Sequence, residues 1–229
     1  MALHAAPWMA RIKRFEASGM AAQPGTDTLV VVGDEGGLLH IPLDAPEQMQ
    51  RDTVEPRGDL EGLAFTPDQR LLVLAEDRDA VWQLDGHRRV HRWKIRPGAP
   101  KKNRGYEGMT CTPERLLLCL GEKKKRSILR SFALPVPGED ALVLLGEQTL
   151  PVPDLAGLCW HGGVLFALSD KGRVLVVLQP DSDKWVERAR YGTPAGDLEA
   201  VAVAGGALFL AQDGGGIWRA PMPAGAIGC

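Results

Sequence analysis

The sequence predicts an all-β protein, a five-bladed β-propeller that forms one domain over residues 1–229. Three observations support this prediction: a repeat of about 45 residues, apolar runs of strand length, and turn-forming residues between the runs. A propeller blade of four antiparallel strands takes about 40–45 residues, so five blades account for the chain. A β-sandwich and a helical repeat are the alternatives, and a helical repeat would need apolar faces of period 3.6, which the sequence lacks.

An acidic phrase followed by apolar residues marks each copy of the repeat. The phrases are GDLEGLAF (58–65), RGYEGMTC (104–111), PDLAGLCW (153–160) and GDLEAVAV (196–203). Their aligned positions Glu61, Glu107, Ala156 and Glu199 are 46, 49 and 43 residues apart. A further step back of 45 residues leads to Glu16, in RFEASGM. The blade repeats are therefore expected to start near residues 16, 61, 107, 156 and 199.

Each copy continues with the pattern of three hairpin-linked strands. A first apolar run is followed by a turn, a second run that ends in Asp or Glu, a tight turn and a third run. Short runs rich in Val, Leu and Phe, bounded by Gly, Pro and Asp, are typical of strands. Glycines in turns such as DKGRV and DGGGI supply the positive φ that hairpins require. More polar fourth strands are expected at 47–55, 90–97, 142–150 and 184–192.

The two ends of the chain predict how the ring closes. The last copy runs out at APMPAGAIGC without a fourth strand, whereas the N-terminal segment PWMARIKRF (7–15) is strand-like and has no place in the first copy. We therefore expect the N-terminal strand to complete the last blade, which would leave no gap in the ring and no unpaired sheet edge there.

The repeated acidic residues predict a ring of carboxylates at one mouth of the central channel. The first strand of each blade lines the channel, so Glu16, Glu61, Glu107 and Glu199 should converge around the axis. The acidic residue that ends each second strand should return to the same mouth after the hairpin. These residues are Asp34, Asp77 or Glu76, Glu122, Asp170 and Asp213. Ala156 interrupts the ring in the fourth copy.

Two interpretations of this ring stay open. In the structural one, each carboxylate accepts backbone N–H bonds from the neighbouring blade or stabilises its own turn. In the other, the carboxylates form a site, because several of them cannot stay ionised in a narrow channel without a counter-charge. A hard cation such as Ca²⁺, held by Glu61, Glu107 and Glu199, would supply that charge. The interleaved cations that would supply it instead are Arg78, Lys123 and Lys171.

The phrase GDLEGLAF, with LLVLAEDRDAVWQL after it, resembles the sequence shared by the phytase-like and SdiA-regulated groups of β-propeller proteins. The resemblance implies that DLEG opens a blade and that an acidic residue closes the next strand. It also implies calcium bound in the channel, with Glu61, Glu107 and Glu199, and less directly Glu16, as ligands. Some relatives of this kind act on phosphoesters or esters. Ala156 departs from the pattern and removes one ligand.

Two functions follow as hypotheses. The first is a binding propeller of unassigned role, which takes a cation, a small molecule or a protein partner at the acidic channel. The second is a calcium-dependent hydrolase of phosphoesters or esters, for which the small molecule would be phosphorylated. The sequence contains no GxSxG, P-loop or HExxH motif, so it shows no dedicated nucleophile or base. Whether the protein is an enzyme is therefore left open.

Composition excludes several other classes. A formal net charge of −2 does not favour a nucleic-acid partner, although residues 87–104 are strongly basic. Four cysteines without a CxxC pair do not indicate a zinc site. No secretory leader is visible, and no window approaches the roughly 18 consecutive apolar residues of a membrane span. We expect a cytoplasmic monomer with reduced thiols and no membrane contact.

Overall fold

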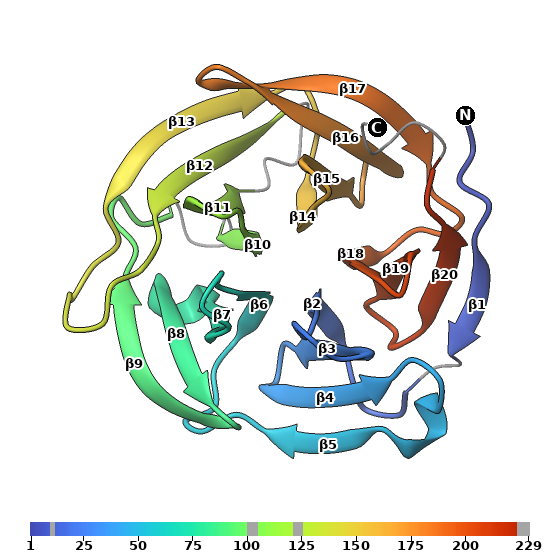
Figure 1. Cartoon of the computed structure of the whole chain (residues 1–229), viewed down its shortest axis with the longest axis horizontal. Coiled ribbons are helices and arrows are strands. Elements are labelled where there is room, and N and C mark those ends of the chain that lie inside the picture. The colour runs from blue at the N-terminus through green and yellow to red at the C-terminus, as the bar shows by residue number, and fades with distance from the viewer. Residues whose placement is uncertain (10–11, 100–104, 121–125, 224–229) are drawn as a thin grey trace.

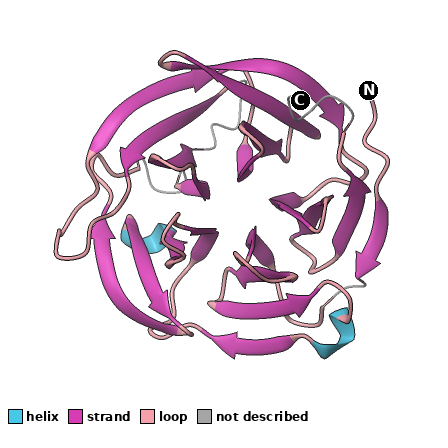
Figure 2. Ribbon diagram, in the orientation of Figure 1, coloured by secondary structure: helices cyan, strands magenta, loops and turns pink. Residues whose placement is uncertain are grey.

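A computed structural model shows the predicted propeller (Figure 1). It describes residues 1–9, 12–99, 105–120 and 126–223. Five four-stranded antiparallel sheets are arranged in a ring around a central axis. Figure 2 shows that strands and loops make up nearly all of the ring. The helical turns in the described residues are the short 3-10 helices η1 (Pro46–Gln48) and η2 (Glu76–Arg78), so none has the length or apolar character needed to span a bilayer.

Every blade is built in the same order from the axis outward. The inner strands are β2 (Ala17–Ala22), β6 (Leu60–Phe65), β10 (Tyr106–Cys111), β14 (Leu155–His161) and β18 (Leu198–Ala204). The second strands are β3 (Thr28–Gly33), β7 (Leu71–Ala75), β11 (Arg115–Leu120), β15 (Val164–Ser169) and β19 (Ala207–Gln212). The third strands are β4 (Gly37–Pro42), β8 (Ala80–Asp85), β12 (Ser127–Ala133), β16 (Val174–Asp181) and β20 (Ile217–Pro221). The outer strands are β5 (Gln50–Thr53), β9 (Arg88–Lys94), β13 (Leu144–Leu150), β17 (Lys184–Gly192) and β1 (Ala6–Met9).

The N-terminal strand completes the last blade, as predicted. β1 pairs antiparallel with β20, with Ala6 opposite Arg219 and Pro7 opposite Trp218. Figure 1 shows β1 at the outer edge of this blade, beside β20. The chain start is also tied to the preceding blade, because the N–H of Leu3 donates to the carbonyl of Gly192 at 2.9 Å. The N-terminal strand β1 and the strand β20 are therefore held in one sheet.

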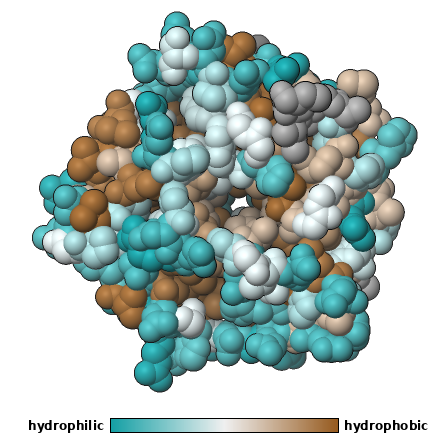
Figure 3. Space-filling model, viewed as in Figure 1, coloured by the Kyte–Doolittle hydropathy of each residue, from teal (hydrophilic) through white to brown (hydrophobic). Residues whose placement is uncertain are grey.

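Glycines let the inner strands approach each other closely around the axis. A Cβ on Gly19 would lie 2.6 Å from the Cα of Gly62 in the next blade, and a Cβ on Gly108 would lie 2.6 Å from the carbonyl oxygen of Ala156. This close approach explains why glycine follows Glu61, Glu107 and Ala156 in the repeated phrase. The strands leave a narrow channel, and its opening is visible at the centre of the molecule in Figure 3.

Apolar side chains fill the spaces between neighbouring sheets. Five clusters of buried residues join each blade to the next. The largest fully buried side chains include Trp82, Trp93, Phe132, Phe166 and Phe209. Burial of such side chains is the main term that stabilises the ring, at about 25 cal/mol per Å² of apolar surface. The rigid ring fixes the positions of the loops at each mouth of the channel.

Candidate acidic site at the channel mouth

A β-bulge at the start of each inner strand positions the acidic phrase. In β6, Leu60 pairs with Ala75 and Gly62 pairs with Leu74, so Glu61 between them has no partner residue on β7. The same shift occurs in the other inner strands, where the bulged residues are Glu107, Ala156 and Glu199. A bulge turns the side chain of the extra residue away from the regular alternation of the strand. These positions are therefore equivalent around the axis.

The first blade departs from the predicted alignment. Its bulge lies between Ala17 and Gly19, so Ser18 takes the place that the repeat assigned to Glu16. The Ser18 hydroxyl donates a hydrogen bond to the carbonyl of Leu60 in the next blade. Glu16 lies two residues earlier and is exposed. The ring of bulged residues thus consists of three carboxylates, one hydroxyl and one methyl group.

The ring of bulged residues forms a first level of the mouth. Glu16 belongs to a second level of acidic residues, together with the Asp of the DLEG phrase. The carbonyl of Glu16 accepts a bond of 3.2 Å from the N–H of Asp34, and the carbonyl of Asp59 accepts one of 2.9 Å from the N–H of Glu76. The same bonds join Asp170 to Asp154 and Asp213 to Asp197. In these blades, the start of the first strand and the end of the second strand therefore meet at one mouth of the channel. This pairing places Glu16 beside Asp34 and not in the channel.

The acids at the ends of the second strands take up a third level. Asp34, Glu76, Asp170 and Asp213 each follow the last residue of a second strand directly. In the second blade this place belongs to Glu76, whereas Asp77 lies one residue further on and pairs with Arg78 at 2.8 Å. The predicted site residues Glu122 and Lys123 lie outside the described residues.

Burial and mutual repulsion raise the pKa values of several carboxyl groups at this mouth. The pKa of Glu61 rises to about 9, first because of desolvation and then because of Asp34 and Glu107. Desolvation, Asp170 and Glu107 raise the pKa of Glu199 to about 8. Glu107 thus acts on both of the other bulged glutamates, which places all three around the same opening. Desolvation and Asp59 raise the pKa of Asp34 to about 6.

Three carboxylates of the second blade lie close enough to share a cation. Oxygens of Asp59, Glu61 and Glu76 all lie within 4.8 Å of one another, and all three residues are half-buried. The pKa values of Asp59 and Glu76 are raised as well, chiefly by desolvation. Among the described residues this is the one group of three potential ligands with such spacing. It contains Glu61 from the predicted set, but neither Glu107 nor Glu199.

Among the residues that the structure describes, the cations near the mouth do not neutralise this group. The Lys171 ammonium pairs with Asp154 at 2.7 Å, in the fourth blade. Arg78 is bound to the exposed carboxylate of Asp77. The charges that act most strongly on Glu61 are all carboxylates. Glu61 and Glu199 also accept no hydrogen bond from the part of the chain that is described, which is uncommon for half-buried carboxylates.

The third level of acids contributes to the structure of the ring. The Asp170 carboxylate accepts a bond of 2.8 Å from the backbone N–H of Asp197 in the next blade. Glu76 likewise accepts a bond from the backbone N–H of Gly105 in the third blade. A Cβ on Gly105 would overlap the Glu76 carboxylate, so this contact requires glycine there. The structural interpretation of the repeated acids therefore holds at this level.

Comparison with known proteins shows similarity of fold. No protein-family model and no curated protein sequence matches the chain. Glutaminyl cyclase from Myxococcus xanthus is 16% identical, with a TM-score of 0.67 over 96% of this chain and 94% of that one. A glucose dehydrogenase is 12% identical, with a TM-score of 0.65 over 96% and 99% of the two chains. The virginiamycin B lyase of Staphylococcus aureus is 9% identical, with a TM-score of 0.55 over 96% and 100%.

The likeness is one of fold alone. At these identities the shared propeller does not carry an activity from one protein to another. The resemblance of the DLEG phrase to the phytase-like propellers therefore stays a prediction made from the motif.

Proposed function

We propose that the propeller binds a hard divalent cation, Ca²⁺ in the first place, at the acidic mouth of its channel. Asp59, Glu61 and Glu76 would be the protein ligands. The observation that carries this proposal is the approach of their oxygens to within 4.8 Å of one another. Carboxylates so close together cannot all be ionised at neutral pH without a positive charge between them.

The chemistry of the ligands favours calcium or magnesium over a transition metal. The group offers oxygen atoms only, and hard cations prefer carboxylate and carbonyl oxygen. Ca²⁺ takes about six to eight ligands, so three carboxylates leave positions for water and for a second molecule. Glu107 and Glu199, across the opening, would then add negative potential or contact that molecule. In the proposed role, the propeller presents a cation to a small molecule or a protein partner.

Cation binding should release protons, and this gives a sharp test. Glu61 carries a proton at neutral pH because its pKa is about 9, and a bound cation would displace it. We would titrate EDTA-treated, desalted protein with CaCl₂ in a calorimeter, in two buffers of different ionisation enthalpy. The observed heat should differ between the buffers by an amount that reports proton release. The melting temperature should rise with CaCl₂, because a ligand of the folded state stabilises it.

Variants connect this binding to the site. Glu61→Gln should abolish both the proton release and the rise in melting temperature. Asp181→Asn changes an exposed carboxylate at the end of β16 and should leave both unchanged. If neither Ca²⁺ nor Mg²⁺ changes the melting temperature or releases protons from the wild-type protein, the proposal is wrong.

A second candidate function is a calcium-dependent hydrolase of phosphoesters or esters. The observation that favours it is the spread of pKa values among carboxyls that are not proposed ligands, about 8 for Glu199 and about 6 for Asp34. Two carboxyls so different can serve as proton donor and proton acceptor near neutral pH. Hydrolysis of p-nitrophenyl phosphate or p-nitrophenyl acetate should then depend on Ca²⁺ and be lost in the double variant Glu61→Gln, Glu199→Gln. If neither substrate is hydrolysed in the presence of Ca²⁺, the hydrolase function is rejected and cation binding is retained as the proposed function.

A further inference from the structure

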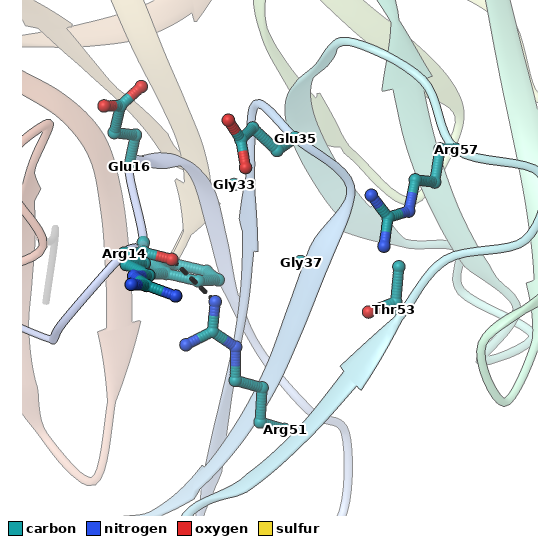
Figure 4. A pocket seen from close by; sticks show the side chains of 9 residues that line it. Arg14, Glu16, Gly33, Glu35, Gly37, Arg51, Thr53 and Arg57 are labelled. Atoms are coloured by element: carbon teal, nitrogen blue, oxygen red, sulfur yellow. Dashed lines mark hydrogen bonds between the residues drawn. The ribbon is translucent and has the colours of Figure 1, made fainter.

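A polar pocket lies in the first blade, beside the acidic mouth but outside the channel. Its volume is about 340 Å³. The connection before β2, the β3–β4 turn, the outer strand β5 and the connection to β6 all contribute to its wall. The polar side chains that line it are those of Arg14, Glu16, Glu35, Arg51, Thr53 and Arg57 (Figure 4). The arginines of the pocket do not belong to the acidic positions that repeat around the channel. Within the described residues, the pocket is therefore a feature of this blade.

Arg51 is held in a fixed position at the pocket. Its guanidinium donates hydrogen bonds to the carbonyls of Arg14 at 2.6 Å and of Lys13 at 3.1 Å. It also lies 5.6 Å from the ring centroid of Phe15, a cation–π distance. The buried Phe15 ring fits closely over Gly37, where a Cβ would lie 2.8 Å from it. Since a guanidinium has five N–H donors, Arg51 retains donors for a ligand.

The charges of the pocket are separated and not cancelled. In Figure 4 the carboxylates of Glu16 and Glu35 lie at the top of the hollow, the guanidinium of Arg51 lies below them, and Arg57 and Thr53 lie to the right. Within the described ranges, the side chains of Arg57, Glu16 and Glu35 form no ion pair. A ligand with a negative and a positive group would thus meet complementary charge at both ends.

We propose that this pocket binds a free α-amino acid. The ligand carboxylate would lie between Arg51 and Arg57 and accept a hydrogen bond from Thr53, because a guanidinium matches a carboxylate in planar, bidentate geometry. The ligand ammonium would face Glu35 and Glu16. The pocket volume is sufficient for an amino-acid side chain, and the two glutamates would bind the ammonium group, which a ligand that is only anionic lacks. This inference goes beyond the proposed cation site and does not depend on it.

The test uses EDTA-treated protein, so that cation binding at the mouth plays no part. We would screen the twenty L-amino acids by saturation-transfer NMR and measure the strongest binder by calorimetry. The N-acetyl derivative and the carboxamide of that amino acid each lack one charge, and both should bind about tenfold or more weakly. Inorganic phosphate should not compete. If no amino acid binds, or if the N-acetyl derivative or phosphate binds as well as the amino acid, the proposal is wrong.

Two variants place the binding in this pocket. Arg57→Met and Glu35→Gln should each weaken binding about tenfold or more, because each removes one charged hydrogen-bonding partner. Both side chains are exposed and unpaired in the described chain, so the melting temperature should not change. Arg188→Met, an exposed arginine on β17 of the fourth blade, is the matched control and should bind normally. Wild-type affinity in both pocket variants would overturn the assignment, even if an amino acid binds elsewhere.

Discussion

Asp170 and Asp197 belong to neighbouring blades and are joined by a hydrogen bond of 2.8 Å from the backbone N–H of Asp197 to the Asp170 carboxylate. Glu76 and Gly105 make the same contact between the second and third blades. In each case an acid at the end of a second strand holds the loop that opens the next inner strand. These two seams between blades thus use carboxylates for structure, whereas the bulged Glu61 and Glu199 accept no such bond in the described chain.

The first prediction concerns this seam. Asp170→Ala should lower the free energy of unfolding by about 0.5–1 kcal/mol, because it removes a hydrogen bond to an exposed backbone donor that water can then satisfy. For a chain of this size, that corresponds to a fall in melting temperature of roughly 1–4 °C. Urea unfolding of Asp170→Ala and of the control Asp181→Ala, at an exposed strand end, measures the difference. Equal stability of the two variants would contradict a role for Asp170 in the seam.

The second prediction concerns the glycines of the inner strands. Gly19→Ala should destabilise the protein by about 1–3 kcal/mol or more, because its Cβ would lie 2.6 Å from the Cα of Gly62, in the backbone of the next blade. Gly146→Ala on the outer strand β13 is the matched control, since its Cβ meets nothing within 4 Å. Thermal unfolding of both variants tests the prediction. A neutral Gly19→Ala would mean that the blades can move apart at the axis.

Much of the fold could be predicted from the repeat, because the sequence of each blade has the same pattern of strands and turns. The first blade shows where this reasoning ends. The sequence Ala-Ser-Gly has no acidic residue at the bulge, so the spacing of 45 residues pointed to Glu16. Only the pairing of Ala17 and Gly19 with β3 identifies Ser18 as the bulged residue. Asp59 could have been identified from the sequence, because an Asp stands two residues before the aligned position in three of the four phrases, as Asp59, Asp154 and Asp197.

Other parts of the candidate sites depend on geometry that the repeat does not contain. The choice between Glu76 and Asp77 depends on where β7 ends and η2 begins, and a difference of one residue decides which carboxylate meets Glu61. Arg51 and Arg57 come from an outer strand and a connection, the least regular parts of a blade. Their approach to Glu35 follows from the path of the chain and has no signal in the spacing of the repeat.

The third prediction is a loss of stability with rising pH in the absence of a cation. The pKa of Glu61 rises from 4.5 to about 9 on folding, and that of Glu199 from 4.5 to about 8. The folded state therefore keeps protons that the unfolded state releases, so this contribution is complete below about pH 4.5 and is lost as the pH rises through the folded values. In EDTA, the melting temperature should fall between about pH 6 and about pH 9.

The double variant Glu61→Gln, Glu199→Gln separates this effect from other titrations. Its melting temperature should change less over the same range, and it should exceed that of the wild type near the upper end. Ca²⁺ should reverse the loss in the wild type only. A wild-type melting temperature that rises with pH would show that folding does not raise the pKa values of these carboxyls. An identical slope in the double variant would show the same.

The fourth prediction restores the interrupted position of the ring. Ala156 is 5% exposed and occupies the bulge of β14, between the blades that carry Glu107 and Glu199. Ala156→Glu adds another carboxylate to the mouth, and Ala156→Gln adds nearly the same volume without charge. Near about pH 8, in EDTA, the Glu variant should melt several degrees below the Gln variant, because a further negative charge meets those already present. Ca²⁺ should raise the melting temperature of the Glu variant more than that of the Gln variant, since the added charge increases the attraction for a cation. If the two variants melt together under both conditions, the mouth carries no excess negative potential, and the driving force proposed for cation binding is absent.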